Sequence, residues 1–153
     1  MKFTKSFVFF LIINFSALGI GTWLMNNGPQ SEWYTSLNQA PWTPAGWVFG
    51  AAWTFIMLCF SIYMTFLYLK KSASKFGILF VIQFLLNVSW NYIFFNQHLI
   101  ALGLATIIAL TVVVAIFTFK FRNDLKTKTL LIIPYFMWLC IATSLNTYIL
   151  LNN

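Results

Sequence analysis

Residues 33–53 read WYTSLNQAPWTPAGWVFGAAW, and this stretch decides how the rest of the chain is arranged. It holds four of the seven tryptophans, and three of the four prolines lie in it or just before it. Pro41 and Pro44 exclude a continuous helix through its first half, because proline lacks a backbone donor and clashes with the preceding turn. From about Gly46 the sequence is uninterrupted and apolar, as in a membrane helix. We therefore expect an aromatic loop that folds onto the mouth of a helical bundle.

The composition is that of an integral membrane protein. Hydrophobic residues make up 61% of the 153 residues and charged residues only 7%, whereas soluble domains carry about 25% charged residues. The uncharged runs are long enough for helices of about 20 residues, the length that crosses a bilayer. A chain of this length normally forms one domain. We predict an all-α integral membrane protein, a five-transmembrane-helix bundle in a single domain.

Charges and turn residues divide the chain into five predicted spans. Their approximate limits are 6–25, 46–69, 76–95, 99–119 and 129–150, with an external loop at 26–45. The apolar part of the first span is about 20 residues, longer than the roughly 7–15 residues of a secretory signal, so a retained helix is favoured. In the last span, Pro134 frees the carbonyl of Leu130 and predicts a kink.

All basic residues lie on one side of the predicted membrane. They are Lys2, Lys5, Lys70, Lys71, Lys75, Lys120, Arg122, Lys126 and Lys128. The positive-inside rule then predicts a cytoplasmic amino terminus, with the aromatic loop and the carboxyl terminus outside. The charge is spread over short links and forms no folded basic surface, so nucleic acid is excluded as a partner. Topology, together with attraction to anionic membrane lipid, explains the basic balance.

The chain lacks the groups of hydrolytic or metal-dependent enzymes. Glu32 and Asp124 are its only acids and fall on opposite sides of the predicted membrane, and His98 has no second ligand in its turn. Such enzymes need paired carboxylates, a nucleophile beside a base, or clustered ligands. We therefore predict no metal site and no catalytic residue, and any reactivity must come from a bound ligand. Cys59 and Cys140 fall inside spans, where cysteine acts as a small hydrophobic residue.

Amide side chains recur at helical spacing in the third span. Gln83, Asn87 and Asn91 share one face, and Trp90 lies beside them. An amide that faces lipid is costly, so this face is expected to point inward. The amides then serve either as hydrogen bonds between helices or as ligand contacts, and the two roles can coexist.

Aromatic residues mark two further inward faces. Trp53, Met57 and Ser61 share a face of the second span, and Trp138, Ala142 and Asn146 share one of the fifth. Ala142 leaves a gap below Trp138 that suits a flat ligand, although packing or an interfacial position is the usual role of a membrane tryptophan. Small residues allow close helix approach, within the bundle or in a homodimer. They are Ala17, Gly21, Ala101, Ala105 and Ala109.

Three segments resemble the TspO/MBR family, the tryptophan-rich sensory proteins related to the mitochondrial translocator protein or peripheral-type benzodiazepine receptor. They are residues 33–53, QFLLNVSWNYIFF at 83–95 and PYFMWLCIATSLNTYI at 134–149. The resemblance implies a five-helix bundle, often a homodimer, in a bacterial cell membrane. It also implies a pocket that opens toward the first loop and binds flat hydrophobic molecules: protoporphyrin IX, haem, and isoquinoline or benzodiazepine ligands. No cofactor is obligatory.

The resemblance implies the residues of this pocket by position. They are Tyr34, Trp42, Pro44, Trp53, Asn87, Trp90, Trp138, Ala142 and Leu145. Two features depart from the family. Ala45 replaces the second of two paired prolines, and no Lys or Arg follows Tyr148, so the sterol motif proposed for animal members is incomplete and cholesterol transport is not expected.

We predict a receptor or sensor that binds a porphyrin, with its affinity derived from burial because the outer mouth lacks Lys and Arg. One alternative is light-dependent porphyrin degradation, in which Trp53 or Trp138 gives an electron to the excited porphyrin. A second is transport of a small amphipathic metabolite. Against transport stand the absence of an ionisable residue within the spans and of an inverted repeat.

Overall fold

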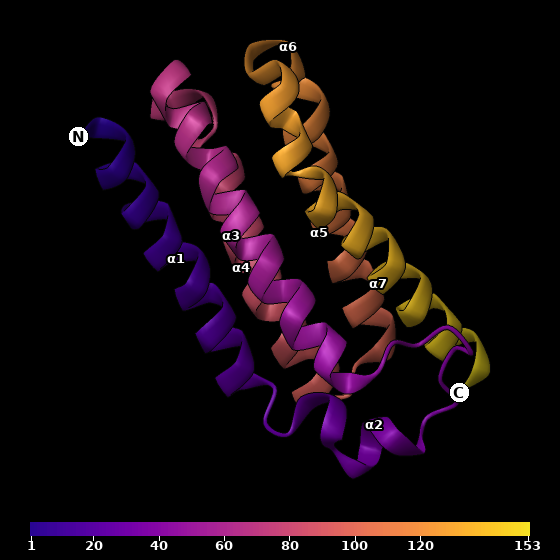
Figure 1. The fold of residues 1–153 in the computed structure, drawn as a ribbon. Coiled ribbons are helices and arrows are strands. Elements are labelled where there is room, and N and C mark those ends of the chain that lie inside the picture. Colours follow the sequence, from indigo (N-terminus) through magenta and orange to yellow (C-terminus); the bar gives the residue numbers. More distant parts are fainter.

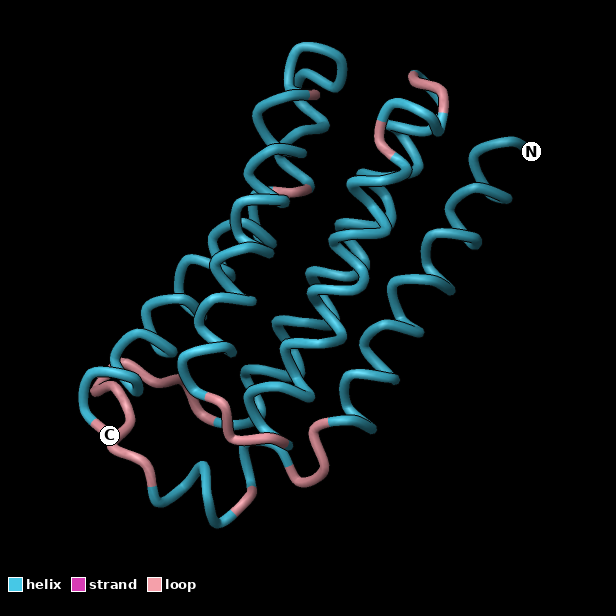
Figure 2. The backbone as a smooth tube through the Cα atoms, turned by 180° about the vertical axis from the view of Figure 1, so that it is seen from behind, coloured by secondary structure: helices cyan, strands magenta, loops and turns pink.

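The computed structural model describes residues 1–153, and it contains helices and connecting segments but no strand (Figures 1 and 2). Five long helices lie side by side. They are α1 (Lys2–Leu24), α3 (Gly46–Lys70), α4 (Gly77–Asn91), α5 (Ile100–Lys120) and α7 (Ile133–Asn152). With the short turns that extend some of them, all five are long and apolar enough to cross a membrane. The predicted five-helix membrane bundle is confirmed.

Short helical turns connect the long helices. They are η1 (Gly28–Gln30), α2 (Glu32–Ser36), η2 (Ala73–Lys75), the π-helical turn η3 (Tyr92–Asn96), α6 (Arg122–Leu125) and η4 (Lys126–Leu131). The helix α2 lies within the predicted loop and begins with a side-chain N-cap. The Ser31 hydroxyl accepts a hydrogen bond from the Tyr34 backbone N–H at 3.2 Å, and Glu32 occupies the positive end of the helix.

The kink predicted at Pro134 is wrong. The fifth span was expected to begin near residue 129, but the tighter turns of η4 occupy Lys126–Leu131 and α7 begins at Ile133. Pro134 therefore stands in the first turn of α7. A proline is well tolerated there, because the first backbone N–H groups of a helix have no partner within the helix.

Some helices that pack against each other are not consecutive in the sequence. The helix α1 packs against α3 and α4, α4 packs against α5, and α5 packs against α7, which also contacts α3. Polar side chains in the core also pair between helices. Asn14 Nδ2 donates to Ser61 Oγ at 2.9 Å, and Gln83 Nε2 donates to the Tyr135 hydroxyl at 2.8 Å. The inward direction predicted for Gln83 is confirmed, and this amide links helices.

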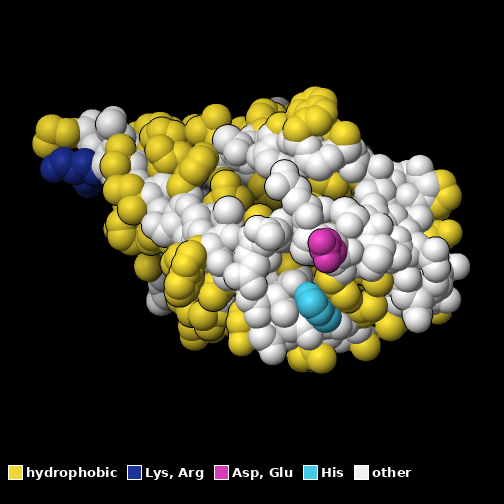
Figure 3. All heavy atoms as spheres, turned by 90° about the horizontal axis from the view of Figure 1, so that it is seen from below, with side chains coloured by type: hydrophobic (Ala, Val, Ile, Leu, Met, Phe, Trp, Pro, Cys, Tyr) yellow, Lys and Arg dark blue, Asp and Glu magenta, His cyan; other side chains and the backbone are white.

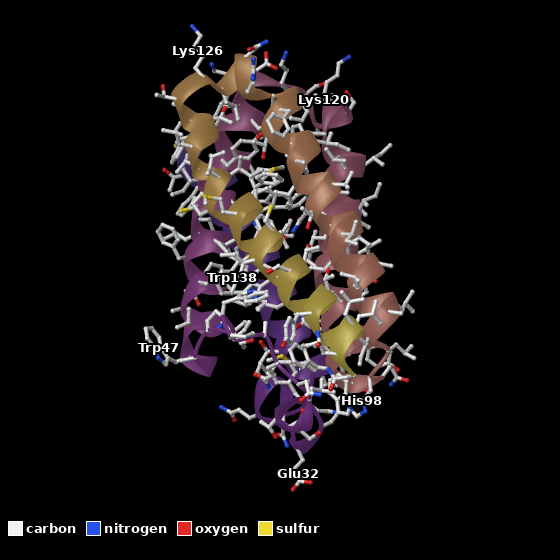
Figure 4. All side chains as sticks on the ribbon, turned by 90° about the vertical axis from the view of Figure 1, so that its right-hand side faces the viewer. Glu32, Trp47, His98, Lys120, Lys126 and Trp138 are labelled. Atoms are coloured by element: carbon white, nitrogen blue, oxygen red, sulfur yellow. The ribbon has the colours of Figure 1, made fainter.

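The two ends of the bundle differ in charge. Figure 4 shows Lys120 and Lys126 at one end and Glu32 and His98 at the other. We call the first the basic end, since every Lys and Arg lies in the helix ends and links there, and the second the loop end. The view of the loop end shows acidic and histidine side chains on the face, and basic side chains only at one edge of the picture (Figure 3). The predicted separation of charge is thus present in the fold.

The sides of the bundle are apolar. Phe9, Ile78 and Phe119 are exposed on different helices, as expected for surfaces that face lipid. Trp23 and Trp47 are 79% and 76% exposed near the loop end, where tryptophan is favoured at a membrane interface. Figure 4 shows Trp47 pointing away from the bundle.

The small residues of α1 serve contacts inside the bundle. Ala17 and Gly21 are buried, and a Cβ atom at Gly21 would lie 2.6 Å from Asn91 Nδ2 of α4. On α5, by contrast, Ala101 and Ala105 are exposed. The homodimer remains a prediction.

Candidate ligand-binding site

A cavity of about 540 Å³ opens between α1, α3 and α4 near the loop end. Its volume falls within the roughly 300–1,000 Å³ of small-molecule sites. None of its 17 lining residues is charged. A ligand enclosed there must therefore be recognised by apolar contact and by hydrogen bonds to neutral groups.

Aromatic rings from α3 form one wall of the cavity. Phe49 and Trp53 line it, and each is held from behind by a ring of α7. Trp138 lies edge-on to Phe49 with the ring centroids 5.6 Å apart, and Tyr135 lies edge-on to Trp53 at 5.8 Å. Figure 4 shows Trp138 on α7 within the middle of the bundle. The α7 rings thus fix the wall without lining the cavity themselves.

Trp90 of α4 forms the opposite part of the wall together with Phe95. The Trp90 indole Nε1–H donates to Asn146 Oδ1 of α7 at 3.4 Å, and Asn146 Nδ2 donates to the Ala142 carbonyl at 2.9 Å. The Trp90 N–H is therefore already engaged. One face of the ring stacks on Phe94, with the ring centroids 5.6 Å apart, so a ligand can meet only the remaining ring surface and not the donor.

Asn87 is the amide that remains free to contact a ligand. Only 4% of the residue is exposed, its side chain makes no hydrogen bond within the protein, and it lines the cavity. The neighbouring Asn91 also lines the cavity, but its Nδ2 donates to the Asn87 carbonyl at 3.1 Å. Of the three amides that share this face of α4, Asn87 alone keeps its full hydrogen-bonding capacity.

The mouth of the cavity is formed by the turn after α1. The lining residues there are Met25, Asn26, Asn27, Pro29 and Gln30, together with Thr22 in the last turn of α1. Asn26 and Gly28 have φ angles of 54° and 48°, a left-handed conformation that asparagine and glycine adopt most readily. The turn signals predicted at the start of the loop therefore shape the entrance.

The aromatic part of the loop lies beside the cavity rather than over it. Trp33 stacks on His98, with the rings 4.1 Å apart and 11° from parallel. Tyr34 is buried, and its ring lies 5.3 Å from that of Phe95. Burial raises the pKa of the Tyr34 phenol, which keeps it neutral. These contacts anchor α2 on η3 and on the link between η3 and α5.

The second half of the loop is attached to α7. Asn38 Nδ2 donates to the Asn152 carbonyl at 2.9 Å. Trp42 is 53% exposed, donates from its Nε1 to Ser144 Oγ at 3.2 Å and lies edge-on to Tyr148. Trp42 therefore covers the outer surface of α7.

Three of the nine residues predicted to bind ligand line the cavity. Trp53, Asn87 and Trp90 line it. The other six do not: Tyr34, Trp42, Pro44, Trp138, Ala142 and Leu145. Ala142 and Leu145 are buried within the bundle, and Pro44 is half-buried. Their direct contact with a ligand stays a prediction.

Several residues that line the cavity were not predicted from the sequence. The chief ones are Leu18, Phe49 and Gly50. A Cβ atom added at Gly46 or Gly50 would meet nothing within 4 Å, so these glycines leave open space at the wall. The GWVFG spacing within residues 33–53 was the available signal, since glycine in a helix often marks a close approach or a gap.

No metal-binding cluster accompanies the cavity. Nowhere in the protein do three or more His, Cys, Asp or Glu side chains come together. Both cysteines are free, Cys59 in the interior and Cys140 on the surface. The chemistry available at the site is therefore stacking, burial and hydrogen bonding.

Comparison with known proteins places the chain among related membrane proteins. The TspO/MBR family model matches residues 9–151. The chain is 31% identical over 129 residues to the tryptophan-rich protein TspO of Chlorobaculum tepidum, covering 82% of each chain. It is 29% identical to the tryptophan-rich sensory protein of Cereibacter sphaeroides, covering 75% of this chain and 73% of the relative. It is 26% identical to the Homo sapiens translocator protein, covering 78% and 74%.

Proposed function

The chain belongs to the TspO/MBR family of membrane sensors and receptors, and from this premise we propose that it binds a porphyrin, such as protoporphyrin IX or haem, in the cavity between α1, α3 and α4. The observation that carries the proposal is the makeup of the cavity wall. Two indole rings, Trp53 and Trp90, and the free amide of Asn87 face an uncharged space of about 540 Å³. A flat, apolar molecule with a hydrogen-bonding edge fits this set of groups.

Binding energy would come from burial and stacking. Removing apolar surface from water contributes about 25 cal/mol per Å². Each well-placed aromatic contact adds about 0.5–1.5 kcal/mol. The α7 rings behind Phe49 and Trp53 hold this wall in place before a ligand arrives, which lowers the entropy lost on binding.

The carboxylates of a porphyrin would remain at the mouth. The lining contains no Lys or Arg to neutralise them, and burying an unpaired carboxylate is costly. Asn26, Asn27 and Gln30 at the entrance provide neutral hydrogen-bonding groups in contact with water. The macrocycle therefore enters ring first, and affinity depends weakly on salt.

Filling the cavity tests the proposal. Gly50→Leu places a side chain in the open space at the wall, and protoporphyrin IX is titrated against tryptophan fluorescence. We expect binding to weaken by at least about tenfold, or about 1.4 kcal/mol. The matched control is Gly19→Leu on α1, where a side chain also meets nothing within 4 Å but which lies outside the cavity. Wild-type affinity in Gly50→Leu would overturn the proposal.

Light-dependent porphyrin degradation is a second candidate, favoured by the two indoles in the cavity wall. Trp53 and Trp90 line it, whereas Trp138 lies behind Phe49. An excited porphyrin would thus take an electron from Trp53 or Trp90. Illuminating the complex in air and following the porphyrin absorption band tests this, and loss at the rate of free porphyrin would exclude catalysis.

A further inference from the structure

A second hollow lies at the basic end, on the lipid-facing side of the bundle. It is a groove of about 660 Å³ between the first half of α1 and the first half of α4. The groove is lined mainly by apolar side chains: Phe9, Phe10, Ile13, Phe76, Phe80, Val81 and Phe84. Phe10 and Phe80 are buried and pack edge-on at 5.5 Å, so they form the floor. Phe9 and Val81, 59% and 55% exposed, form the rims.

A basic pocket of about 750 Å³ continues the groove toward the end of the bundle. Four lysines line it: Lys2, Lys5, Lys70 and Lys71. Lys5, Ser6, Tyr68 and Ala73 line both hollows, so the two are continuous. Neither lining contains an acidic residue. One elongated site therefore joins an apolar channel to a concentration of positive charge.

The positive charge of the pocket is only partly neutralised. Lys71 Nζ pairs with Asp124 at 2.9 Å, and Lys70 Nζ donates to the Asp124 backbone carbonyl at 2.7 Å. Asp124 is the one acid at this end, whereas Lys2 and Lys5 have no acidic partner. The amino-terminal end of α1 lies at the pocket and adds positive potential, and the carboxyl-terminal end of α3, which also lies there, opposes it.

The position and chemistry of the site define one kind of occupant. A small anion would satisfy the lysines but leave the phenylalanine groove empty. A second copy of this chain in the same orientation would bring its own basic end alongside, adding like charge. An anionic phospholipid has both parts, because its acyl chain matches the groove and its phosphate matches the lysines.

We propose that this site binds one anionic phospholipid of the adjoining leaflet, with an acyl chain between α1 and α4 and its phosphate among Lys2, Lys5, Lys70 and Lys71. The half-exposed Tyr68, which lies where groove and pocket meet, places a hydroxyl near the ester level of the lipid. The site is separate from the cavity at the loop end and does not depend on the porphyrin proposal.

The test uses the full chain, delipidated in a neutral detergent. Native mass spectrometry and thermal unfolding follow titration with dioleoylphosphatidylglycerol, dioleoylphosphatidylcholine and inorganic phosphate. We expect one retained phosphatidylglycerol, binding at least about tenfold tighter than phosphatidylcholine. Equal binding of the two lipids would contradict the proposal. A stabilising shift with phosphate as large as that with phosphatidylglycerol would show a simple anion site instead.

Two pairs of variants locate the lipid. Lys2→Gln/Lys5→Gln removes two pocket charges, and Lys120→Gln/Lys126→Gln removes two charges from the same end outside both hollows. Only the first should reduce phosphatidylglycerol retention, and equal loss in both would overturn the proposal. Gly77→Leu fills open space in the groove wall, and Gly19→Leu adds a side chain where neither hollow is affected. Unchanged lipid binding in Gly77→Leu, or a changed oligomeric state without lipid, would contradict an acyl chain in the groove.

Discussion

The cavity at the loop end and the groove at the basic end are both lined with aromatic rings, but they differ in the charged residues beside them. No charged side chain lines the cavity, whereas four lysines stand at the head of the groove. A ligand with a charged group must keep that group in water at the loop end, but can pair an anionic group with lysine at the basic end. The same bundle thus offers one site governed by burial and another governed by charge.

The cavity also depends on a much tighter helix contact than the groove does. Near the loop end, Gly21 of α1 lies directly against Asn91 of α4. Near the basic end, the same two helices diverge enough to leave the groove. The comparison predicts that changes at the first contact affect the whole protein more than changes at the second.

The largest effect is expected from Gly21→Leu. Even a Cβ atom at this position would lie 2.6 Å from Asn91 Nδ2, so α1 must move away from α4. Overpacking of this kind costs about 1–3 kcal/mol. We expect a lower thermal midpoint and weaker porphyrin binding, measured beside Gly19→Leu, which adds the same side chain to open space. Equal midpoints for the two variants would show that this contact is not tight.

The next largest effect separates two asparagines of the cavity region. Asn146→Leu leaves the buried Trp90 indole without its acceptor, and should lower stability by about 1–3 kcal/mol. Asn87→Leu removes an amide that has no hydrogen bond in the protein, so stability should hardly change. Porphyrin affinity should nevertheless fall by about threefold to tenfold, on the scale of one hydrogen bond. Thermal unfolding and fluorescence titration of both variants decide this, and a stability loss confined to Asn87→Leu would reverse the assignment.

Sequence reasoning succeeded where the information was local. The spans follow from uncharged runs between lysines, and α3 begins at Gly46 because Pro41 and Pro44 prevent an earlier start. The start of α7 was missed because the pattern of apolar residues does not distinguish the turns of η4 from an α-helix. Local periodicity therefore predicts that a helix exists better than where it begins.

The candidate site was only partly predictable because inward faces do not reveal which helices are neighbours. Trp138 does point into the bundle, but its neighbour is Phe49 rather than open space. Trp53 and Asn87 also point inward, and they meet at the cavity because α1, α3 and α4 come together there. Helix adjacency is a property of the whole chain, and no spacing within one span contains it.

A smaller effect concerns salt. Raising the salt concentration from about 0.05 M to about 0.5 M shortens the screening length several-fold. Porphyrin affinity should change less than about twofold, because no charged residue lines the cavity. Retention of phosphatidylglycerol should fall over the same range, because the lysines of the basic pocket are partly exposed. Parallel titrations compare the two, and an equally steep loss of porphyrin binding would place its carboxylates near basic residues.

The smallest effect is expected at the contact between Trp33 and His98. His98→Ala removes the ring on which Trp33 of the loop stacks. The loss should lower the local stability of the loop by about 0.5–1.5 kcal/mol. Because this contact lies outside the cavity, porphyrin affinity should be nearly unchanged while amide hydrogen exchange in α2 becomes faster. A large loss of affinity would mean that the aromatic loop contacts the ligand directly.

The most direct measurement is a structure of the protein with bound protoporphyrin IX. The macrocycle is predicted to lie between α1, α3 and α4, with its faces against Trp53 and Trp90 and one edge at Asn87, and with its carboxylates at the mouth near Asn26 and Gln30. A macrocycle held instead between Trp42 and Trp138 against α7 would contradict this assignment. The binding site would then be formed by the other residues predicted from the sequence.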